Sequence, residues 1–234
     1  MQYEWILFDA DGTLFDYDRA EYETLRETFH ELIGEFAPDY AGRYSRINDE
    51  VWLLFEQGEV TPERLRTLRF ERLFAELNVT QDPAEFSQHY MENLSRHTEL
   101  IPGAEELLNT LKGQINMMLI TNGLSQVQRE RYAKSILPGY MQDMVVSEEV
   151  GAAKPAPEIF REAFRRMGKP EKETVLMVGD SLSSDVKGAN TFGIDVCWFD
   201  SGDADPPEDV EIQHRITRLT ELSQIVRQHS NGEE

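Results

Sequence analysis

A short apolar run near the start of the chain ends in two carboxylates, and this junction constrains the fold more than any other feature. Residues 5–8 are all apolar, a run too short for a helix and typical of a strand buried on both faces. Asp9 and Asp11 follow it, and in extended backbone side chains two residues apart point to the same side. Because like charges at that distance repel and are costly to desolvate, a bound divalent cation is one explanation. A strand end that exits into solvent is the alternative.

The segment after this strand has a different pattern. Between residues 16 and 97, apolar residues recur at helical spacing, and prolines and glycines divide the segment into roughly four helices. The next strand candidate is residues 117–120, although a parallel crossover needs only about a dozen residues. We therefore expect an inserted helical cap domain over residues 16–99, and a core domain formed by residues 1–15 and 100–234.

From residue 102 onward, short apolar strands alternate with amphipathic helices. This alternation is typical of a parallel sheet covered by helices on both faces. The predicted fold is an α/β, doubly wound, mainly parallel five-stranded (Rossmann-like) sheet with an inserted helical cap. The expected strands are residues 5–8, 117–120, 144–146, 175–178 and 196–199.

Polar side chains follow four of these strands. They are Asp9, Asp11, Thr121, Asn122, Lys154, Asp180 and Asp185. Taken singly, each has an ordinary interpretation: Thr121 and Asn122 as a turn, Lys154 as a solvated side chain, and Asp180 as a helix cap. Ligands of open parallel sheets bind beyond the carboxyl ends of the strands, where all of these residues are expected to meet. Their joint placement predicts an active site at that edge.

Phosphoryl transfer is the chemistry that needs this set of groups. A carboxylate nucleophile divides the reaction through an aspartyl-phosphate intermediate, and a second carboxylic acid protonates the leaving oxygen and then activates water. Mg²⁺ accepts one or two carboxylates together with waters and phosphate oxygens. A lysine and hydroxyl or amide donors stabilise the charge on the transferred group.

The polar stretches resemble, in order, the four motifs of the haloacid dehalogenase-like (HAD) superfamily. The stretches are residues 9–14, 121–123, 154–155 and 179–185. The resemblance implies Asp9 as nucleophile, Asp11 as general acid and base, and phosphate binding by Thr121, Asn122 and Lys154. It also implies Mg²⁺ held by Asp9, Asp11 (through its main-chain carbonyl) and Asp180, with Asp185 supporting that shell. Dehalogenases of the superfamily lack an acid at the position of Asp11, so its presence favours a phosphatase.

A narrower resemblance suggests the substrate. Residues 5–15, 146–151 and 175–180 are similar to bacterial pyrimidine 5′-nucleotidases of the YjjG type, which implies a nucleoside monophosphate as substrate. Acylneuraminate-9-phosphate phosphatases, other sugar-phosphate phosphatases and sugar-phosphate mutases remain alternatives. A receiver-like, phosphate-accepting module is disfavoured because it needs no large helical insertion. Trp52 and Phe55 are either base-stacking residues or part of the cap core.

Charge and cysteine content limit the partners. The net charge of −21 disfavours nucleic acid and anionic membranes, which carry the same sign of charge. One cysteine, Cys197, excludes an intramolecular disulfide and fits a reducing compartment. No apolar run is long enough to span a bilayer. We expect a cytoplasmic monomer or homodimer that acts on a small phosphorylated metabolite.

Overall fold

The computed structural model describes residues 3–200, 202 and 206–228, and these fall into two compact units. The first, the core unit, contains the chain up to residue 16, residues 99–125 and the chain from residue 135 onward. The second, the helical unit, contains residues 17–98 together with 126–134. The sequence assigned residues 16 and 99 to the cap domain and residues 126–134 to the core domain, so the two divisions differ at these positions.

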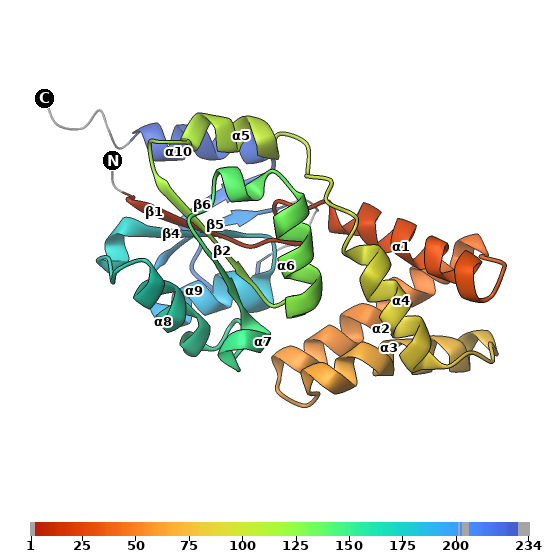
Figure 1. Ribbon diagram of the computed structural model, residues 1–234. Helices are drawn as coiled ribbons and strands as arrows, with labels where there is room; N and C mark the ends of the chain where they lie inside the picture. Colours follow the sequence, from red (N-terminus) through yellow and green to blue (C-terminus); the bar gives the residue numbers. More distant parts are fainter. Residues whose placement is uncertain (1–2, 201, 203–205, 229–234) are drawn as a thin grey trace, which may run out of the picture. The chain divides into compact units, whose positions relative to one another are not determined.

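A six-stranded parallel sheet forms the centre of the core unit (Figure 1). Its strands are β1 (Trp5–Phe8), β2 (Asn116–Thr121), β3 (Met144–Val146), β4 (Val175–Gly179), β5 (Asp195–Phe199) and β6 (His214–Ile216). They are ordered β3-β2-β1-β4-β5-β6, the doubly wound order of Rossmann-like sheets. The predicted fold class is confirmed. The sixth strand was not predicted, because its three residues include two polar ones and give no apolar run.

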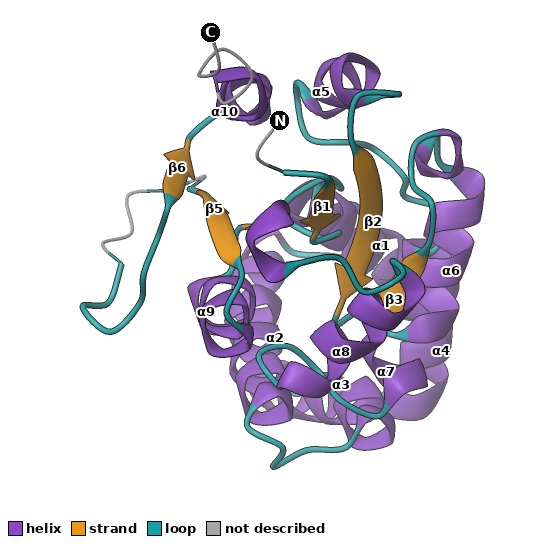
Figure 2. Cartoon of the chain, turned by 90° about the vertical axis from the view of Figure 1, so that its left-hand side faces the viewer, coloured by secondary structure: helices purple, strands orange, loops and turns teal. Residues whose placement is uncertain are grey.

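Helices cover both faces of this sheet (Figures 1 and 2). α8 (Pro157–Arg166) and α9 (Lys187–Phe192) lie on one face, and α5 (Ala104–Leu111) and α10 (Leu222–Gln228) lie together on the other. Phe160 and Phe192 of the first pair stack at 5.5 Å and pack with Leu7 and Met177 into a dry core. Burying such side chains stabilises the fold by about 1.5–3 kcal/mol each.

The strand register sets which residues meet at the carboxyl edge. Phe8 of β1 is paired with Leu119 of β2 on one side and with Val178 of β4 on the other. The strand order reverses between β1 and β4, and ligands of doubly wound sheets bind at such a switch point. The residues just after these two strands are therefore the first place to look for a site.

The helical unit contains α1 (Tyr17–Leu32), α2 (Pro38–Glu56), α3 (Pro62–Leu77), α4 (Pro83–Leu94) and most of α6 (Ser125–Lys134). Proline begins α2, α3 and α4, where its missing N–H costs nothing. Thr61 and Asp82 cap α3 and α4 by accepting main-chain N–H groups. These signals explain why four helices were predictable between residues 16 and 97.

Aromatic side chains form the centre of the helical unit. Phe29, Phe70, Phe74, Phe86 and Tyr90 are buried, with ring centroids 5.0–6.5 Å apart along the contacts between them. Trp52 and Phe55 of α2 are half-buried and meet edge to face at 5.6 Å.

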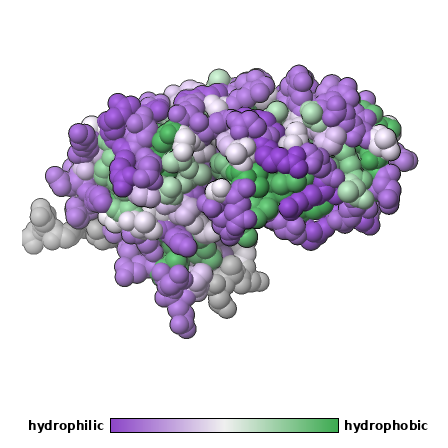
Figure 3. Space-filling model, turned by 90° about the horizontal axis from the view of Figure 1, so that it is seen from below, coloured by the Kyte–Doolittle hydropathy of each residue, from purple (hydrophilic) through white to green (hydrophobic). Residues whose placement is uncertain are grey.

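The surface is consistent with the charge of the chain. The face shown in Figure 3 is mostly hydrophilic, with smaller apolar areas. Among the described residues, no helix combines the length and apolar character needed to cross a membrane.

Candidate active site

Asp9 lies at the carboxyl end of β1, at the switch point of the sheet. Its N–H donates to the main-chain oxygen of Val178 at 2.9 Å, which continues the strand pairing by one residue. The chain then turns: the N–H groups of Leu14 and Phe15 both donate to the oxygen of Ala10. This turn leaves Asp9 buried at the strand end, whereas Asp11 is half-buried in the turn itself.

Lys154 reaches this point from the loop between α7 (Ser147–Val150), which follows β3 directly, and α8. Its side chain is buried, and its ammonium contacts three acceptors: Asp9 Oδ1, Asp185 Oδ1 (2.7 Å) and the main-chain oxygen of Ile120 (2.9 Å). Burial alone would lower the pKa of Lys154, but the two carboxylates outweigh it and hold the pKa above its usual value. Since an ammonium has three N–H donors, a phosphate contact by Lys154 must share one of them.

Asn122 fixes the main chain of that loop. Its Nδ2 donates to the oxygen of Lys154 (2.9 Å) and its Oδ1 accepts the N–H of Lys154 (2.7 Å). The sequence predicted phosphate binding for Asn122, whereas the structure shows its side-chain amide paired with the Lys154 main chain. Thr121, which is buried beside it, accepts the N–H of Gly123 at 3.0 Å.

Asp180 and Asp185 follow β4. Thr13 donates to Asp180 Oδ1 at 3.0 Å, and Asp185 Oδ2 accepts the N–H of Ser181 at 3.1 Å. Residues 182–186 form a π-helical turn, wider than an α-helical one, that precedes α9. The turn is wider because the oxygen of Ser181 accepts the N–H groups of both Asp185 and Val186, and the second bond spans five residues.

Two glycines leave room for these carboxylates. A Cβ atom at Gly12 would overlap the carboxylate of Asp180, and one at Gly179 would overlap that of Asp185. Gly12 also has φ +77, a conformation in which L side chains are strained. Both positions therefore require glycine if the carboxylates are to stay where they are.

The carboxylates of Asp9, Asp180 and Asp185 gather around one point. Each contributes an oxygen that lies within 4.8 Å of the others, and within the described part of the chain this is the one such group of three. Burial is the largest cause that raises the pKa of Asp9 well above its usual value, with further contributions from Asp185 and Asp180 and an opposing one from Lys154. Burial and Asp185 likewise raise the pKa of Asp180 to about 7.

This charge balance indicates a cation site. Three carboxylates face one ammonium, so full ionisation leaves two excess negative charges in a largely buried place. Carboxylate oxygens are the ligands that Mg²⁺ prefers, and a doubly charged cation would neutralise the excess. Asp185, expected only as outer support, contacts Lys154 and lies inside the group. In the sequence, the motif at residues 179–185 implied a supporting role for it.

Asp11 is not among these three carboxylates. It lies in the turn after β1, where residues 11 and 15 form an isolated bridge. Its predicted contribution of a main-chain carbonyl to a metal and its role as acid and base stay predictions.

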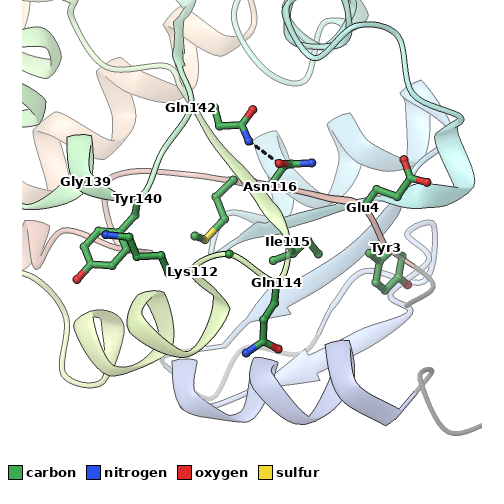
Figure 4. A pocket seen from close by; sticks show the side chains of 11 residues that line it. Tyr3, Glu4, Lys112, Gln114, Ile115, Asn116, Gly139, Tyr140 and Gln142 are labelled. Carbon is green, nitrogen blue, oxygen red and sulfur yellow. Dashed lines mark hydrogen bonds between the residues drawn. The ribbon is translucent and has the colours of Figure 1, made fainter.

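A cavity lies at the amino ends of the strands, the end opposite the carboxylate group. It measures about 430 Å³ and is lined by residues that precede or begin β1 and β2, among them Glu4, Lys112 and Asn116 (Figure 4). Lys112 lies over the ring of Tyr140 at 4.9 Å, and Gln142 donates to Asn116. Among the described residues, the one group of three possible metal ligands lies at the carboxyl edge, which is therefore the candidate active site.

Several known proteins are similar to this chain. A family model described as haloacid dehalogenase-like hydrolase matches residues 3–193. The chain is 33% identical to pyrimidine 5′-nucleotidase YjjG of Escherichia coli, over 98% of this chain and all of that protein. It is 31% identical to pyrimidine 5′-nucleotidase PynA of Streptococcus pneumoniae (85% and 84%) and 28% identical to glyceraldehyde 3-phosphate phosphatase of Methanopyrus kandleri (95% and 97%).

Solved structures with the same fold are also found. The HAD-hydrolase YfnB of Bacillus subtilis, crystallised with magnesium, superposes with a TM-score of 0.91 at 33% identity and covers 97% of this chain and 99% of its own. The L-2-haloacid dehalogenase of Xanthobacter autotrophicus has a TM-score of 0.77 at 18% identity, covering 96% and 98%. The second likeness shows the fold alone.

Proposed function

Since the chain belongs to the haloacid dehalogenase-like hydrolase family, we propose that it is a Mg²⁺-dependent phosphomonoester hydrolase that acts on pyrimidine nucleoside 5′-monophosphates. The observation that carries the chemistry is the group of Asp9, Asp180 and Asp185 around Lys154 at the switch point of the sheet. The identity with YjjG and PynA supports the substrate class.

In the first step, a carboxylate oxygen of Asp9 attacks the phosphorus atom. A bond forms between that oxygen and phosphorus, and the bond from phosphorus to the nucleoside oxygen breaks. Asp11 gives its proton to the leaving oxygen, so the nucleoside departs as a neutral alcohol. Lys154 orients the Asp9 carboxylate through their direct contact.

In the second step, Asp11, now ionised, takes a proton from water, and the water oxygen attacks the phosphorus of the aspartyl phosphate. The bond to Asp9 breaks, which restores its carboxylate and releases inorganic phosphate. Asp180 and Asp185 would hold Mg²⁺ beside Asp9, and the main-chain carbonyl of Asp11 would add a further ligand. The bound ion shields the negative nucleophile from the negative phosphate.

Thr121 and the loop that follows β2 would bind the phosphate oxygens. The Thr121 side chain is buried at the strand end, on the strand next to β1. Asn122 contributes through Lys154, whose main chain it holds at both the N–H and the carbonyl oxygen.

A sugar-phosphate phosphatase is the second candidate. It is supported by the 28% identity with glyceraldehyde 3-phosphate phosphatase over nearly the whole of both chains. Both candidates use the same chemistry and differ only in what is attached to the phosphate, so substrate selection separates them.

Phosphate release from a substrate panel tests the proposal. The panel contains UMP, dUMP, dTMP, purine monophosphates, glyceraldehyde 3-phosphate and sialic acid 9-phosphate, with Mg²⁺ or chelator and with Asp9→Asn as blank. A lead of about tenfold for the pyrimidine monophosphates equals about 1.4 kcal/mol of discrimination and is the expected result. A leading sugar phosphate would favour the second candidate. Release that survives chelation or the Asp9 substitution would refute the mechanism.

A further inference from the structure

We propose that Trp198 is a positioning residue for the metal ligand Asp180, and that its indole N–H sets the affinity of the site for Mg²⁺. The inference rests on the proposed function, since it assumes that the carboxylate group holds a metal. It adds a residue of β5, a strand that carries none of the motifs found in the sequence.

The contact is direct and specific. Trp198 is paired with Gly179 across β4 and β5, so its side chain starts one residue from Asp180 in register. Its Nε1–H donates to the main-chain oxygen of Asp180 at 2.9 Å, and the ring is 2% exposed. A buried indole N–H needs an acceptor, and here that acceptor belongs to a proposed metal ligand.

Both the main-chain oxygen and the carboxylate of Asp180 therefore accept a hydrogen bond. Trp198 holds its main chain from β5, while Thr13 donates to its carboxylate from the turn after β1. Between these two bonds the side chain has little freedom to rotate. Outer partners of this kind orient metal ligands and typically change metal affinity about 10–100-fold when removed.

The unpredicted edge strand β6 supports the indole. Arg215 of β6 lies over the Trp198 ring at 4.8 Å and donates through Nε to Asp200 Oδ2 at 3.0 Å. Asp200 is buried at the end of β5, and its N–H donates to the oxygen of Ile216. The ring is therefore held by a residue of β6, the neighbour of β5 on the side opposite β4.

The competing explanation is that Trp198 only fills the core. It belongs to the same apolar cluster as Trp5, which is also buried. A substitution that removes the N–H and keeps the ring separates the two explanations. β-(3-Benzothienyl)alanine has this property, because sulfur replaces the indole N–H in a ring of nearly the same shape.

The experiment places this amino acid at position 198 or, as matched control, at position 5. Mg²⁺ affinity is measured by titration calorimetry, and thermal unfolding is measured in chelator. We expect the position-198 variant to bind Mg²⁺ about tenfold more weakly, with kcat restored at saturating Mg²⁺. Its unfolding temperature in chelator should be about 2–4 °C below that of the control, as expected for one lost hydrogen bond. Trp198→Phe, which also lacks the donor, should weaken Mg²⁺ binding in the same direction.

Unchanged Mg²⁺ affinity at position 198, with normal binding by the wild-type protein, would overturn the inference and leave the proposed function standing. An equal loss of affinity in the position-5 control would also overturn it, because the effect would then be general to the core. If the wild-type protein binds no Mg²⁺, the proposed function fails and this inference fails with it.

Discussion

The two units each bury a cluster of charged side chains, but the clusters differ in charge balance. In the core unit, Asp9, Asp180 and Asp185 face the single ammonium of Lys154. In the helical unit, the cluster holds one buried acid, Glu21, and one buried base, Arg69, while the nearby Asp49 is exposed to solvent. Asn48 joins the buried pair, since it donates to Glu21 (2.9 Å) and accepts from Arg69 (3.1 Å).

The difference shows how a ligand site can be told from a structural network. The Glu21 cluster is held by groups of the chain: Tyr44 donates to Asn48, and the Arg69 guanidinium lies over the rings of Phe70 and Tyr90. When its three carboxylates are ionised, the Asp9 cluster has an excess of negative charge, and among the described residues only the Lys154 ammonium forms an ion pair with it. We conclude that excess charge of one sign, more than burial of charge, marks the site of an external ion.

The largest expected effect is the loss of activity in Asp9→Asn. An amide is a poor nucleophile, so kcat should fall by at least about a thousandfold, or about 4 kcal/mol. The free energy of unfolding without metal should rise, because one of three mutually repelling carboxylates becomes neutral. Phosphate release and denaturant titration measure the two effects.

Glu21→Gln is the matched control for this prediction, since it makes the same chemical change in the balanced cluster. It should leave kcat largely unchanged. A loss comparable to that of Asp9→Asn would show that the helical cluster takes part in the reaction. Charge balance would then not separate a ligand site from a structural network.

The second prediction compares the two buried cations. Lys154→Met leaves three carboxylates without their ammonium, so the free energy of unfolding should fall by about 3–5 kcal/mol. Arg69→Met leaves Glu21, which can take up a proton, and should cost only about 1–3 kcal/mol. Denaturant unfolding in chelator measures both. Equal losses would contradict the argument from charge balance.

Sequence reasoning found the core cluster because its residues follow predicted strands. Asp9, Lys154 and Asp180 each come directly after an apolar strand or in the loop beyond it, and parallel strands bring their carboxyl ends to one edge. The same reasoning identified the fold class and the four helices between residues 16 and 97. This reasoning uses the apolar periodicity and the turn residues within each segment, which do not depend on contacts with distant parts of the chain.

The parts that were missed depend on contacts between distant segments. Three helices contribute the helical cluster, which contains Glu21, Asn48 and Arg69. The spacing of these residues in the sequence does not indicate that they are in contact. β6 has too few residues to show a period. The pairing of Asn122 with the Lys154 main chain, and of Trp198 with Asp180, requires knowledge of which loops and strands are neighbours.

The third prediction concerns pH and the helical cluster. Burial, followed by the nearby Asp49 carboxylate, raises the pKa of Glu21 from 4.5 to about 7. Between these values the folded chain holds a proton that the unfolded chain has released, so the free energy of unfolding falls as pH rises. The fall amounts to about 3 kcal/mol.

Denaturant unfolding from pH 4 to pH 8 measures this slope. Glu21→Gln should lower the slope by the contribution of Glu21, because the amide does not titrate, while the raised pKa values of Asp9 and Asp180 leave a slope of the same sign. The lowering should be the same with and without Mg²⁺. An identical slope in the wild-type and Glu21→Gln proteins would show that another group is responsible.

The last prediction concerns metal addition, and its effect is the smallest. A ligand that binds only the folded state stabilises it by about 2.7 kcal/mol at a free concentration a hundred times its Kd. For a chain of this size that corresponds to a rise of about 5–10 °C in Tm. Glu21→Gln should keep the full rise, because its cluster has no excess charge, whereas Asp180→Asn should lose most of it. A rise that is lost in Glu21→Gln and kept in Asp180→Asn would place the cation in the helical unit and reverse the comparison between the two clusters.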